Sequence, residues 1–458
     1  MKILVVGSGG REHAIAWRLA QDAEGHAIFC APGNAGTAAV AENVPVGAED
    51  VGGIVAWAKA ERPDLVVVGP EAPLVAGLVD ALQGEGIPAF GPVAAGARME
   101  GSKTFAKEVM SAAGVPTGKA ATFKDPAAAK AALDDFGLPV VIKADGLAAG
   151  KGVVVAETRE AAEAAIDEML VGGKFGASGA EVLVEEFLHG EECSILALVD
   201  GERAVLLPSS QDHKRAFDGD TGPNTGGMGA YSPAPVITSD RLPEIRDRII
   251  LPVVRELKRR GIVYRGVLYA GLMVNDENSN PHGPVAKSGS DINVVEFNAR
   301  FGDPETEAVL PRLGGSFATA LLHAATGCLA DSDVVVRDEC AATVIVASGG
   351  YPGSYAKGKE IEFKEEGRRK KEEGEGKKEE GKGEKEDGEG KVIVFHCGTK
   401  RDGERVVTSG GRVLSVTGLG PTLREAVDAA YSGVERISFE GAFFRRDIAH
   451  RAFSRDGV

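Results

Sequence analysis

Short β-branched runs alternate with helical patterns throughout the first hundred residues. The pattern predicts strands at Ile3 to Val6, Leu65 to Val68 and Pro88 to Phe90, and helices from about Arg11 and Leu74. Such alternation is typical of a parallel sheet with helices on its faces. Because sheets of this kind bind ligands at the carboxyl ends of their strands, the loops that follow the strands are candidate binding sites.

The loop after the first strand is rich in glycine and reads Gly7-Ser8-Gly9-Gly10-Arg11-Glu12-His13. Its glycines allow close approach of the backbone, and the N-terminus of the following helix favours an anion. The dinucleotide-binding pattern GxGxxG is incomplete, because Glu12 stands where the third glycine belongs. A tight strand-to-helix connection explains the same residues. Gly69 to Leu74, which follows the strand Leu65 to Val68, is a second candidate loop, and its alternative explanation is a loop made rigid by prolines.

A later β-rich run, Ile292 to Asn298, ends in a cluster of acidic, amide and guanidinium groups. Alternate residues of a strand share a face, so we expect Ile292, Val294, Glu296 and Asn298 to point the same way. Two neighbouring oxygen ligands at the edge of a core suit a hard cation such as Mg²⁺. A strand whose end simply reaches solvent would carry the same residues.

An apolar run from Leu138 to Lys143 predicts a buried strand that ends in a lysine, and burial of a lysine is costly unless it meets an anion. A glycine-rich turn, Asp145 to Gly152, and the strand Val153 to Val155 follow. They predict a flexible hairpin whose backbone N–H groups can fold over phosphates. The turn is not a Walker loop, because GxxxxGK[ST] is absent and no helix follows. A plain hairpin with an exposed lysine is the alternative.

Further polar segments punctuate the middle of the chain. The strand Val182 to Leu188 leads into a short turn that can offer backbone groups to a purine, and Glu192 can accept ribose hydroxyls. Gln211 to Arg215 and Asn224 to Tyr231 are too long for turns, and loops of this size are usually functional or disordered. An amphipathic helix is expected at Asp240 to Arg260 and a strand at Gly266 to Val274.

After Ala325 a third region is expected, with strands around Ala342 to Ala347 and Lys391 to His396 and a closing helix from about Thr422 to Ser438. Between these strands, Lys364 to Gly390 consists almost wholly of Glu, Lys, Arg and Gly. Without apolar residues to pack, this insertion is predicted to be solvated and disordered.

Length and charge limit the classes of protein that this chain can be. With 458 residues it should divide into roughly three domains. The net charge of -16 argues against a nucleic-acid partner and leaves small molecules as the expected ligands. Five widely spaced cysteines without a CxxC pair indicate a reducing compartment, and no apolar run is long enough to span a membrane. We therefore expect a cytoplasmic protein, either a monomer or a weak dimer.

Taken together, the motifs resemble those of the glycinamide ribonucleotide synthetases, or phosphoribosylamine-glycine ligases, of the ATP-grasp superfamily. The resemblance covers nearly the whole chain outside the insertion. It rests on six segments, which are Gly7 to Ala14, Gly69 to Leu74, Lys143 to Gly152, Glu185 to Leu188, Asn224 to Tyr231 and Glu296 to Glu305.

The resemblance implies a multidomain α/β and α+β architecture. Its parts would be an N-terminal parallel-sheet pre-ATP-grasp domain at residues 1–102, a two-lobed ATP-grasp domain at 103–325 and a C-terminal α+β domain at 326–458. A mobile lid lobe would span about 120–190, and the charged insertion about 364–390. The implied activity is a magnesium- or manganese-dependent ligation of glycine to 5-phosphoribosylamine in purine biosynthesis. ATP would first convert glycine to glycyl phosphate, and the products would be glycinamide ribonucleotide, ADP and phosphate.

The resemblance also assigns residue roles. Glu296 and Asn298 would be metal ligands, and Arg300, Lys143, Asp212 and Lys214 would act on the transferring group. The ATP phosphates, adenine and ribose would be bound by Lys103, Lys143, Gly146, Gly150, Lys151, Gly152, Glu185, Leu188 and Glu192. Phosphoribosylamine would be bound by Gly9, Gly10, Arg11, Glu12, Glu71, Gly227 and Asp303.

Several alternatives stay open at this stage. Another carboxylate-amine ligase or a biotin-dependent carboxylase would share the nucleotide site and differ in the acceptor. A nicotinamide dehydrogenase would use the first region but leave Lys143, Glu296 and Asn298 without a role. A nucleotide-binding regulatory protein would bind ATP without turnover. Many ATP-grasp enzymes carry an acidic ligand on the strand before the metal strand, and Gly266 to Val274 offers none, which leaves the number of metal ions open.

Overall fold

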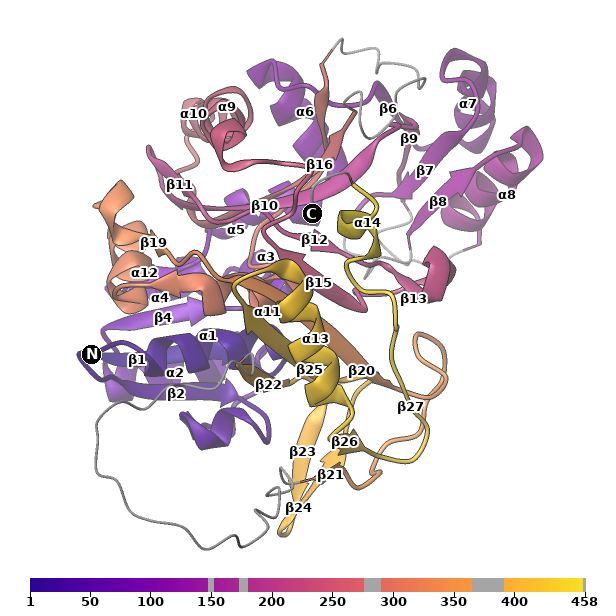
Figure 1. Ribbon diagram of the computed structural model, residues 1–458. Coiled ribbons are helices and arrows are strands. Elements are labelled where there is room, and N and C mark those ends of the chain that lie inside the picture. Colours follow the sequence, from indigo (N-terminus) through magenta and orange to yellow (C-terminus); the bar gives the residue numbers. More distant parts are fainter. Residues whose placement is uncertain (147–151, 173–179, 276–289, 365–390, 456–458) are drawn as a thin grey trace, which may run out of the picture.

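The computed structural model describes residues 1–146, 152–172, 180–275, 290–364 and 391–455. It confirms the predicted multidomain α/β and α+β architecture, with a parallel N-terminal sheet, a middle region of two sheets and a C-terminal region built on an antiparallel sheet (Figure 1). The hairpin turn at 147–151 and most of the charged insertion lie outside the described residues.

The N-terminal sheet is parallel and has the strand order β3-β2-β1-β4-β5. Alternate residues of β1 enter two cores, because Ile3 and Val5 pack with α1 whereas Leu4 and Val6 pack against α2 and α4. Helices therefore cover both faces, as predicted. The elements are β1 (Lys2–Gly7), α1 (Gly10–Ala20), β2 (Ala27–Pro32), β3 (Glu42–Asn43), α2 (Val51–Glu61), β4 (Leu65–Val68), α3 (Glu71–Val75), α4 (Leu78–Gly84), β5 (Ala89–Phe90) and α5 (Ala94–Gly101).

The sequence patterns missed β2 and β3, which are short or irregular in composition. The single helix expected from about Leu74 is instead two helices, α3 and α4. Gly77 separates them in a left-handed conformation with φ of +85°, which a glycine adopts without steric cost.

The first sheet of the middle region carries the strand and hairpin around Lys143, and has the order β6-β9-β7-β8. It extends away from the rest of the molecule at the upper right of Figure 1, with α7 and α8 beside it. Its elements are β6 (Ala120–Phe123), α7 (Pro126–Ala131), β7 (Val140–Ala144), β8 (Val153–Ala156), α8 (Arg159–Leu170) and β9 (Val182–Glu186). This lobe has its own hydrophobic core, formed by residues of the two helices and of β7 and β9.

The second sheet of the middle region has the order β11-β10-β16-β17 and is antiparallel. One face packs against α6 and α10 through residues such as Phe105, Val109 and Leu257. Helix α6 begins at Lys103, because the Ser102 side chain accepts a hydrogen bond from Phe105 N as its N-cap. The elements are α6 (Lys103–Ala113), β10 (Glu191–Asp200), β11 (Ala204–Leu206), α9 (Leu242–Ile245), α10 (Leu251–Arg259), β16 (Arg265–Val274) and β17 (Ile292–Asn298).

One prediction about β17 was wrong. Ile292 and Val294 join the core under α6, but so does Phe297, and Glu296 lies over Gly271 on the opposite face. The cause is a β-bulge: Val294 pairs with Leu272 and Glu296 with Gly271, so Val295 is an extra residue that shifts the alternation by one. Glu296 and Asn298 still share a face, but it is not the face of Ile292 and Val294.

Two further predictions need correction. The segments at 211–215 and 224–231 contain four short strands instead of loops alone: β12 (Gln211–Asp212), β13 (Arg215–Phe217), β14 (Thr221–Asn224) and β15 (Gly229–Ser232). The helix expected at Asp240 to Arg260 is divided into α9, a π-helical turn at Arg246–Ile250 and α10. Pro252 in the first turn of α10 has no N–H for a regular i→i−4 bond, which accounts for the widened turn before it.

The C-terminal sheet includes strands of the middle region, in the order β12-β15-β20-β25-β22. Gly229 to Ser232 pairs with β20, so the polar segment before it is fixed to the C-terminal region. The predicted strands and closing helix are present. Here the elements are α11 (Glu305–Val309), α12 (Phe317–Thr326), β20 (Cys340–Ser348), β22 (Val392–His396), β23 (Thr399–Asp402), β24 (Arg405–Thr408), β25 (Arg412–Gly420), α13 (Leu423–Val434), β27 (Ala442–Phe443) and α14 (His450–Phe453).

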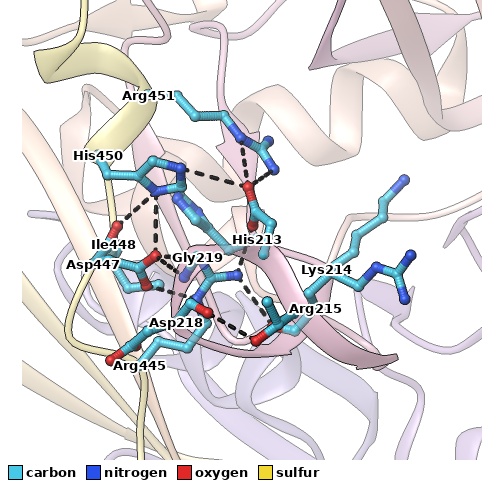
Figure 2. A network of polar contacts seen from close by, with 12 residues as sticks. His213, Lys214, Arg215, Asp218, Gly219, Arg445, Asp447, Ile448, His450 and Arg451 are labelled. Carbon is cyan, nitrogen blue, oxygen red and sulfur yellow. Dashed lines mark hydrogen bonds and ion pairs between the residues drawn. The ribbon is translucent and has the colours of Figure 1, made fainter.

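The C-terminal segment folds back on the β13–β14 hairpin through a network of charged residues (Figure 2). The Arg445 guanidinium is fully buried and lies 2.8 Å from carboxylates of both Asp220 and Asp447. Arg451 is 2.7 Å from Asp220. The neutral ring of His213, whose pKa is lowered to about 3 by burial, accepts a hydrogen bond from Ala449 N. The segment that carries Asp212 and Lys214 is thereby fixed at its base.

A buried aspartate connects the N-terminal region to the middle region. Asp22 accepts hydrogen bonds from Phe317 N at 2.9 Å and Ala318 N at 2.8 Å, at the start of α12, and lies 2.7 Å from Arg18 Nη1. The arginine in turn donates to the carbonyls of Leu313 and Gly315.

We predict that Asp22→Ala lowers the melting temperature by several degrees, because it leaves a buried arginine and two N–H groups without their acceptor, a loss of about 3 kcal/mol or more. Differential scanning calorimetry would measure the change. Glu24→Ala, an exposed carboxylate two residues away, is the control. Equal melting temperatures for the two variants would contradict the prediction.

Candidate active site

The polar face of the second middle sheet carries several carboxylates. A Cβ on Gly271 would stand 3.3 Å from Glu296 Cγ and 3.8 Å from Glu192 Oε1, so the absence of a side chain makes room for both. Deeper on this face, the Tyr269 hydroxyl donates to Glu305 Oε1 at 2.9 Å and lies 2.8 Å from Ser194 Oγ. Asn298 pairs with Tyr269 across the strands. Glu296 and Asn298 thus sit together beside a hydrogen-bonded acidic group.

Glu296 is surrounded by positive charge. Burial raises the pKa of its carboxyl, but the charges of Lys214, Lys143, Lys103 and Arg300 outweigh this effect and bring the pKa below its ordinary value. These cations come from four separate segments of the chain. The Glu296 carboxylate is therefore ionised at neutral pH and lies where strand β17 meets the three lysines.

Lys143 is buried and is balanced by Glu185. Its Nζ lies 2.6 Å from Glu185 Oε2 and 3.3 Å from the carbonyl oxygen of Val295, the residue before Glu296. Glu185 also pairs with Lys107 of α6, which donates to Thr117 Oγ1 at 2.7 Å. The two lysines share one carboxylate, and this shared pair holds the first lobe against the second at this point.

Lys103 binds a backbone carbonyl instead of a carboxylate. Its Nζ donates to the carbonyl of Gly146 at 2.9 Å, and within the described parts of the chain it forms no ion pair. Burial lowers the pKa of this lysine despite the charge of Glu296. Asp145 fixes the turn before the hairpin, since it accepts hydrogen bonds from Ser102 Oγ at 3.1 Å and Thr104 N at 3.0 Å. Gly152 is buried, whereas Gly150 and Lys151 lie outside the described residues.

Asp212, Lys214 and Glu192 form a second charged group at the same face. Lys214 Nζ pairs with Glu192, and the charges of Glu192, Asp212 and Glu296 outweigh burial and raise its pKa well above the ordinary value. Burial raises the pKa of Asp212 to about 8, although Lys214 opposes the shift. Leu188 is buried at the end of the strand that carries Glu185. Among the described residues predicted to bind the nucleotide, the structure brings Lys103, Lys143 and Glu192 into the surroundings of Glu296, and Glu185 pairs with Lys143.

The glycine-rich loops of the N-terminal sheet form an adjoining group. Arg300 Nη2 lies 2.9 Å from Glu100 and its Nε lies 3.6 Å from Glu71, the first residue of α3. Arg11 lies 2.6 Å from Glu12 and donates to the carbonyl of Phe301 at 3.0 Å. Both arginines are therefore already bound to carboxylates or carbonyls. The charges of Glu100 and Glu71 outweigh burial and raise the pKa of Arg300.

Glu12 has a structural role that its place in the loop did not predict. It accepts a hydrogen bond from Gly9 N at 2.6 Å, and its carboxylate fills the space beside Gly7 and Gly69, where a Cβ would collide with it. The residue that breaks the dinucleotide pattern therefore links the two candidate loops. Gly10 in turn lies against Glu307 and Cys397.

A divalent cation fits Glu296 and Asn298, because they present an ionised carboxylate and an amide oxygen from the same face of β17. The described residues hold one ready-made group of three His, Cys, Asp or Glu ligands, namely Asp22, Glu24 and His26. That group is distant in sequence from β17, and Asp22 is fully engaged at the start of α12. We regard it as structural.

Sequence analysis missed four residues that shape this site: Lys107, Glu100, Tyr269 and Arg412. Lys107 lies one helical turn after Lys103, so the i, i+4 spacing could have suggested it. Glu100, Tyr269 and Arg412 carry no local signal, since each belongs to an otherwise ordinary helix or strand.

Comparison with known proteins gives the class of the chain. Residues 101–306 match the ATP-grasp (A) domain of phosphoribosylglycinamide synthetase. Residues 1–100 match the N domain of the same synthetase and residues 341–451 match its C domain. The middle region is therefore an ATP-grasp domain.

Full-length relatives agree. The phosphoribosylamine–glycine ligase of Vibrio cholerae is 45% identical over 461 residues, covering 100% of this chain and 99% of its own. That of Salmonella typhimurium is 46% identical over 462 residues, with 100% of both chains covered. The crystal structure of the phosphoribosylamine–glycine ligase from Thermotoga maritima superposes with a TM-score of 0.81 at 34% identity, covering 98% of this chain and 100% of its own. The chain belongs to the phosphoribosylglycinamide synthetase family, which confirms the resemblance drawn from its motifs.

A biotin carboxylase from Campylobacter jejuni has a similar fold, with a TM-score of 0.69 at 14% identity over 97% of this chain and 92% of its own. This similarity concerns the fold alone.

The raised pKa of Asp212 predicts a pH dependence of stability. The folded protein keeps a proton that the unfolded chain releases at its ordinary pKa of 3.8. The stabilisation is complete below that pH and is lost as the pH rises towards about 8. Relative to Asp212→Asn, the free energy of unfolding of the wild type should fall between pH 5 and 7 by up to about 1.4 kcal/mol per pH unit. Urea denaturation at several pH values measures this slope, with the exposed Asp428→Asn as control. A constant difference between Asp212→Asn and wild type would contradict the assignment.

Proposed function

We propose that the protein is an ATP-dependent ligase that joins glycine to 5-phosphoribosylamine through glycyl phosphate. The products are glycinamide ribonucleotide, ADP and phosphate, in purine biosynthesis. Two lines of support meet here: full-length relatives are named phosphoribosylamine–glycine ligases, and the charges of four cations act on the carboxylate of Glu296. The second observation carries the proposal, because cations from four separate segments that meet at one ionised carboxylate suit the phosphates of ATP and a metal ion.

In this proposal Lys103, Lys143 and the turn from Gly146 through Gly150 and Lys151 to Gly152 bind the ATP phosphates. Lys103 is the best placed of these, because it has no carboxylate partner in the described chain. Glu185, Leu188 and Glu192 would bind adenine and ribose. The ion pairs of Glu185 with Lys143 and Lys107 indicate that its carboxylate also positions the lysine.

Glu296 and Asn298 would hold Mg²⁺ or Mn²⁺. When bound, such an ion neutralises phosphate charge during phosphoryl transfer. Because this transfer depends mainly on positioning and charge neutralisation, lysines and metal ligands matter more than a general base.

In the first step an oxygen of the glycine carboxylate attacks the γ-phosphorus of ATP, and ADP leaves. In the second, the amine of phosphoribosylamine attacks the carbonyl carbon of glycyl phosphate, phosphate leaves with the bonding electrons, and the amine loses a proton. Lys143, Lys214 and Arg300 would stabilise negative charge in these steps. Asp212, with a pKa of about 8, is suited to exchange a proton near neutral pH.

Phosphoribosylamine would bind to the adjoining loops, through Gly9, Gly10, Arg11, Glu12, Glu71, Gly227 and Asp303. The convergence of these residues from four segments of the chain supports the assignment. The ion pair of Arg300 with Glu71 supports a position of this group beside the proposed nucleotide site.

We also propose domain boundaries at residues 1–102, 103–325 and 326–458, with a lid at about 120–190. The ligands are small molecules, and the net charge of -16 argues against nucleic acid. No helix in the described residues is long and apolar enough to cross a membrane. The five cysteines are free, which favours a cytoplasmic location. A monomer or weak dimer is expected.

The proposal predicts strict substrate dependence. ADP should accumulate only when glycine and phosphoribosylamine are both present with ATP and Mg²⁺, as measured by a coupled ADP assay. Release of ADP driven by bicarbonate, or by a different amine, would transfer the protein to a sister ATP-grasp activity. ATP binding without any turnover would indicate a regulatory protein.

A second prediction concerns Glu296. Glu296→Ala should lower kcat by about 100-fold or more, because it removes the charged metal ligand, while the circular dichroism spectrum stays that of wild type. Asp291→Ala, a half-exposed aspartate just before the same strand, is the matched control and should retain activity. Wild-type turnover in Glu296→Ala would contradict the proposed site.

A further inference from the structure

Asp303 stands where three parts of the chain converge. Its Oδ2 atom lies 3.6 Å from the point where a Cβ on Gly9 would stand, so its carboxylate faces the N-terminal glycine loop. The following residue, Pro304, packs directly against Gly227, whose φ of +103° favours glycine. The N-terminal loop and the Gly226-Gly227 loop thus approach each other across Asp303.

The third part is the C-terminal region, which contributes Arg412 at the start of β25. Its Nη1 atom lies 3.0 Å from both the carbonyl oxygen and Oδ1 of Asp303, and it also donates to the carbonyl of Gly226. Tyr351 supports the same loop, because its hydroxyl accepts a hydrogen bond from Gly226 N at 3.1 Å. Arg412 and Tyr351 of the C-terminal region therefore bind the carbonyl and the N–H group of the same residue, Gly226. Together they fix the backbone of the Gly226-Gly227 loop.

The electrostatics of this junction depend on Arg412. Its side chain is four-fifths buried. The negative charge of Asp303 outweighs the effect of burial and keeps the pKa of Arg412 above the ordinary value. Glu307, also buried nearby, has a pKa raised well above its usual range by burial and by the charge of Asp303. Without Arg412, the carboxyl groups of Asp303 and Glu307 would lose the positive charge that lies beside them.

We propose that Arg412 is a positioning residue for the phosphoribosylamine site. It acts through Asp303 and the Gly226-Gly227 loop, fixes both relative to Gly9, and so makes the C-terminal region part of the acceptor site. This inference rests on the proposed function. It assigns a role in substrate affinity to a region that contributes none of the residues predicted from the motifs.

The test compares four variants of the full-length protein. Arg412→Ala removes all of these contacts, and Arg412→Lys keeps the charge but cannot bridge Asp303 and Gly226 in the same way. Tyr351→Phe removes one hydrogen bond and preserves the packing of the ring. Arg405→Ala, an exposed arginine of β24 in the same region, is the control for loss of charge. KM and kcat are measured for each substrate, and binding of the product glycinamide ribonucleotide is measured by calorimetry.

We expect Arg412→Ala to raise the KM for phosphoribosylamine and the Kd for glycinamide ribonucleotide by about 10- to 100-fold, since displaced loops misplace the substrate. The KM values for ATP and glycine should change by less than about twofold, because those subsites keep their contacts. Arg412→Lys should recover part of the affinity, Tyr351→Phe should show a smaller shift in the same direction, and Arg405→Ala should match the wild type.

Three outcomes would overturn the inference. The KM for phosphoribosylamine could stay at its wild-type value in both Arg412→Ala and Tyr351→Phe, or all three KM values could rise together, which would mean a general structural defect. If Arg412→Ala does not fold, the inference is also overturned by a wild-type Kd for glycinamide ribonucleotide in both Tyr351→Phe and Arg412→Lys. A wild type that shows no dependence on phosphoribosylamine would instead reject the proposed function, so the two failures are distinguishable.

Discussion

The ionised carboxylate of Glu296 in a group of buried and partly buried cations is the interaction on which the rest of this structure depends. One cation comes from the start of α6, one from the end of β7, one from the segment after β12 and one from the loop after β17. Each of these elements must therefore bring its cation close to Glu296, because a buried charge without a partner costs several kcal/mol. The Glu185 carboxylate likewise balances buried positive charge, because it pairs with both Lys143 and Lys107. Charge balance thus ties the two lobes together and leaves Lys103 as the cation best able to meet an anionic ligand.

Glycines provide the space in which these charges meet. Gly271 leaves room for Glu296 and Glu192, while Gly7 and Gly69 leave room for Glu12 between two loops of the N-terminal sheet. A side chain at Gly7 or Gly69 would occupy the volume of the Glu12 carboxylate, and one at Gly271 would press on the side chain of Glu296. Ion pairs then join the charged group around Glu296 to the N-terminal loops, because Arg300 pairs with Glu71 of α3 and Glu100 of α5. Substrates bound to the two groups would then meet near Arg300, as the proposed acyl transfer requires.

Several features of this fold could be predicted from local patterns. The strand at Leu65 to Val68, the strand around Ala342 to Ala347 and the closing helix from about Thr422 were found because hydrophobic periodicity and helix-cap chemistry are local properties. The predictions failed where the local structure depends on the pairing of a segment with neighbouring strands. The bulge at Val295 is imposed by the pairing of β16 with β17, and it moved Glu296 to the face opposite Val294. The polar segments around Asp212 became strands because β20 offers them an edge, which nothing in their composition indicates.

The sequence by itself determined the order of the motifs, the residue types that phosphoryl transfer needs and the adjacency of Glu296 and Asn298, because these depend on spacing along one strand or one loop. The tertiary structure decided which of those side chains meet. Lys143 and Lys103 lie on different elements, Arg412 reaches Asp303 from more than a hundred residues away, and Glu12 joins two loops that the sequence separates. Such contacts arise from the packing of whole sheets and helices, where burial forces each charge to find a partner, and no local pattern encodes which partner that will be.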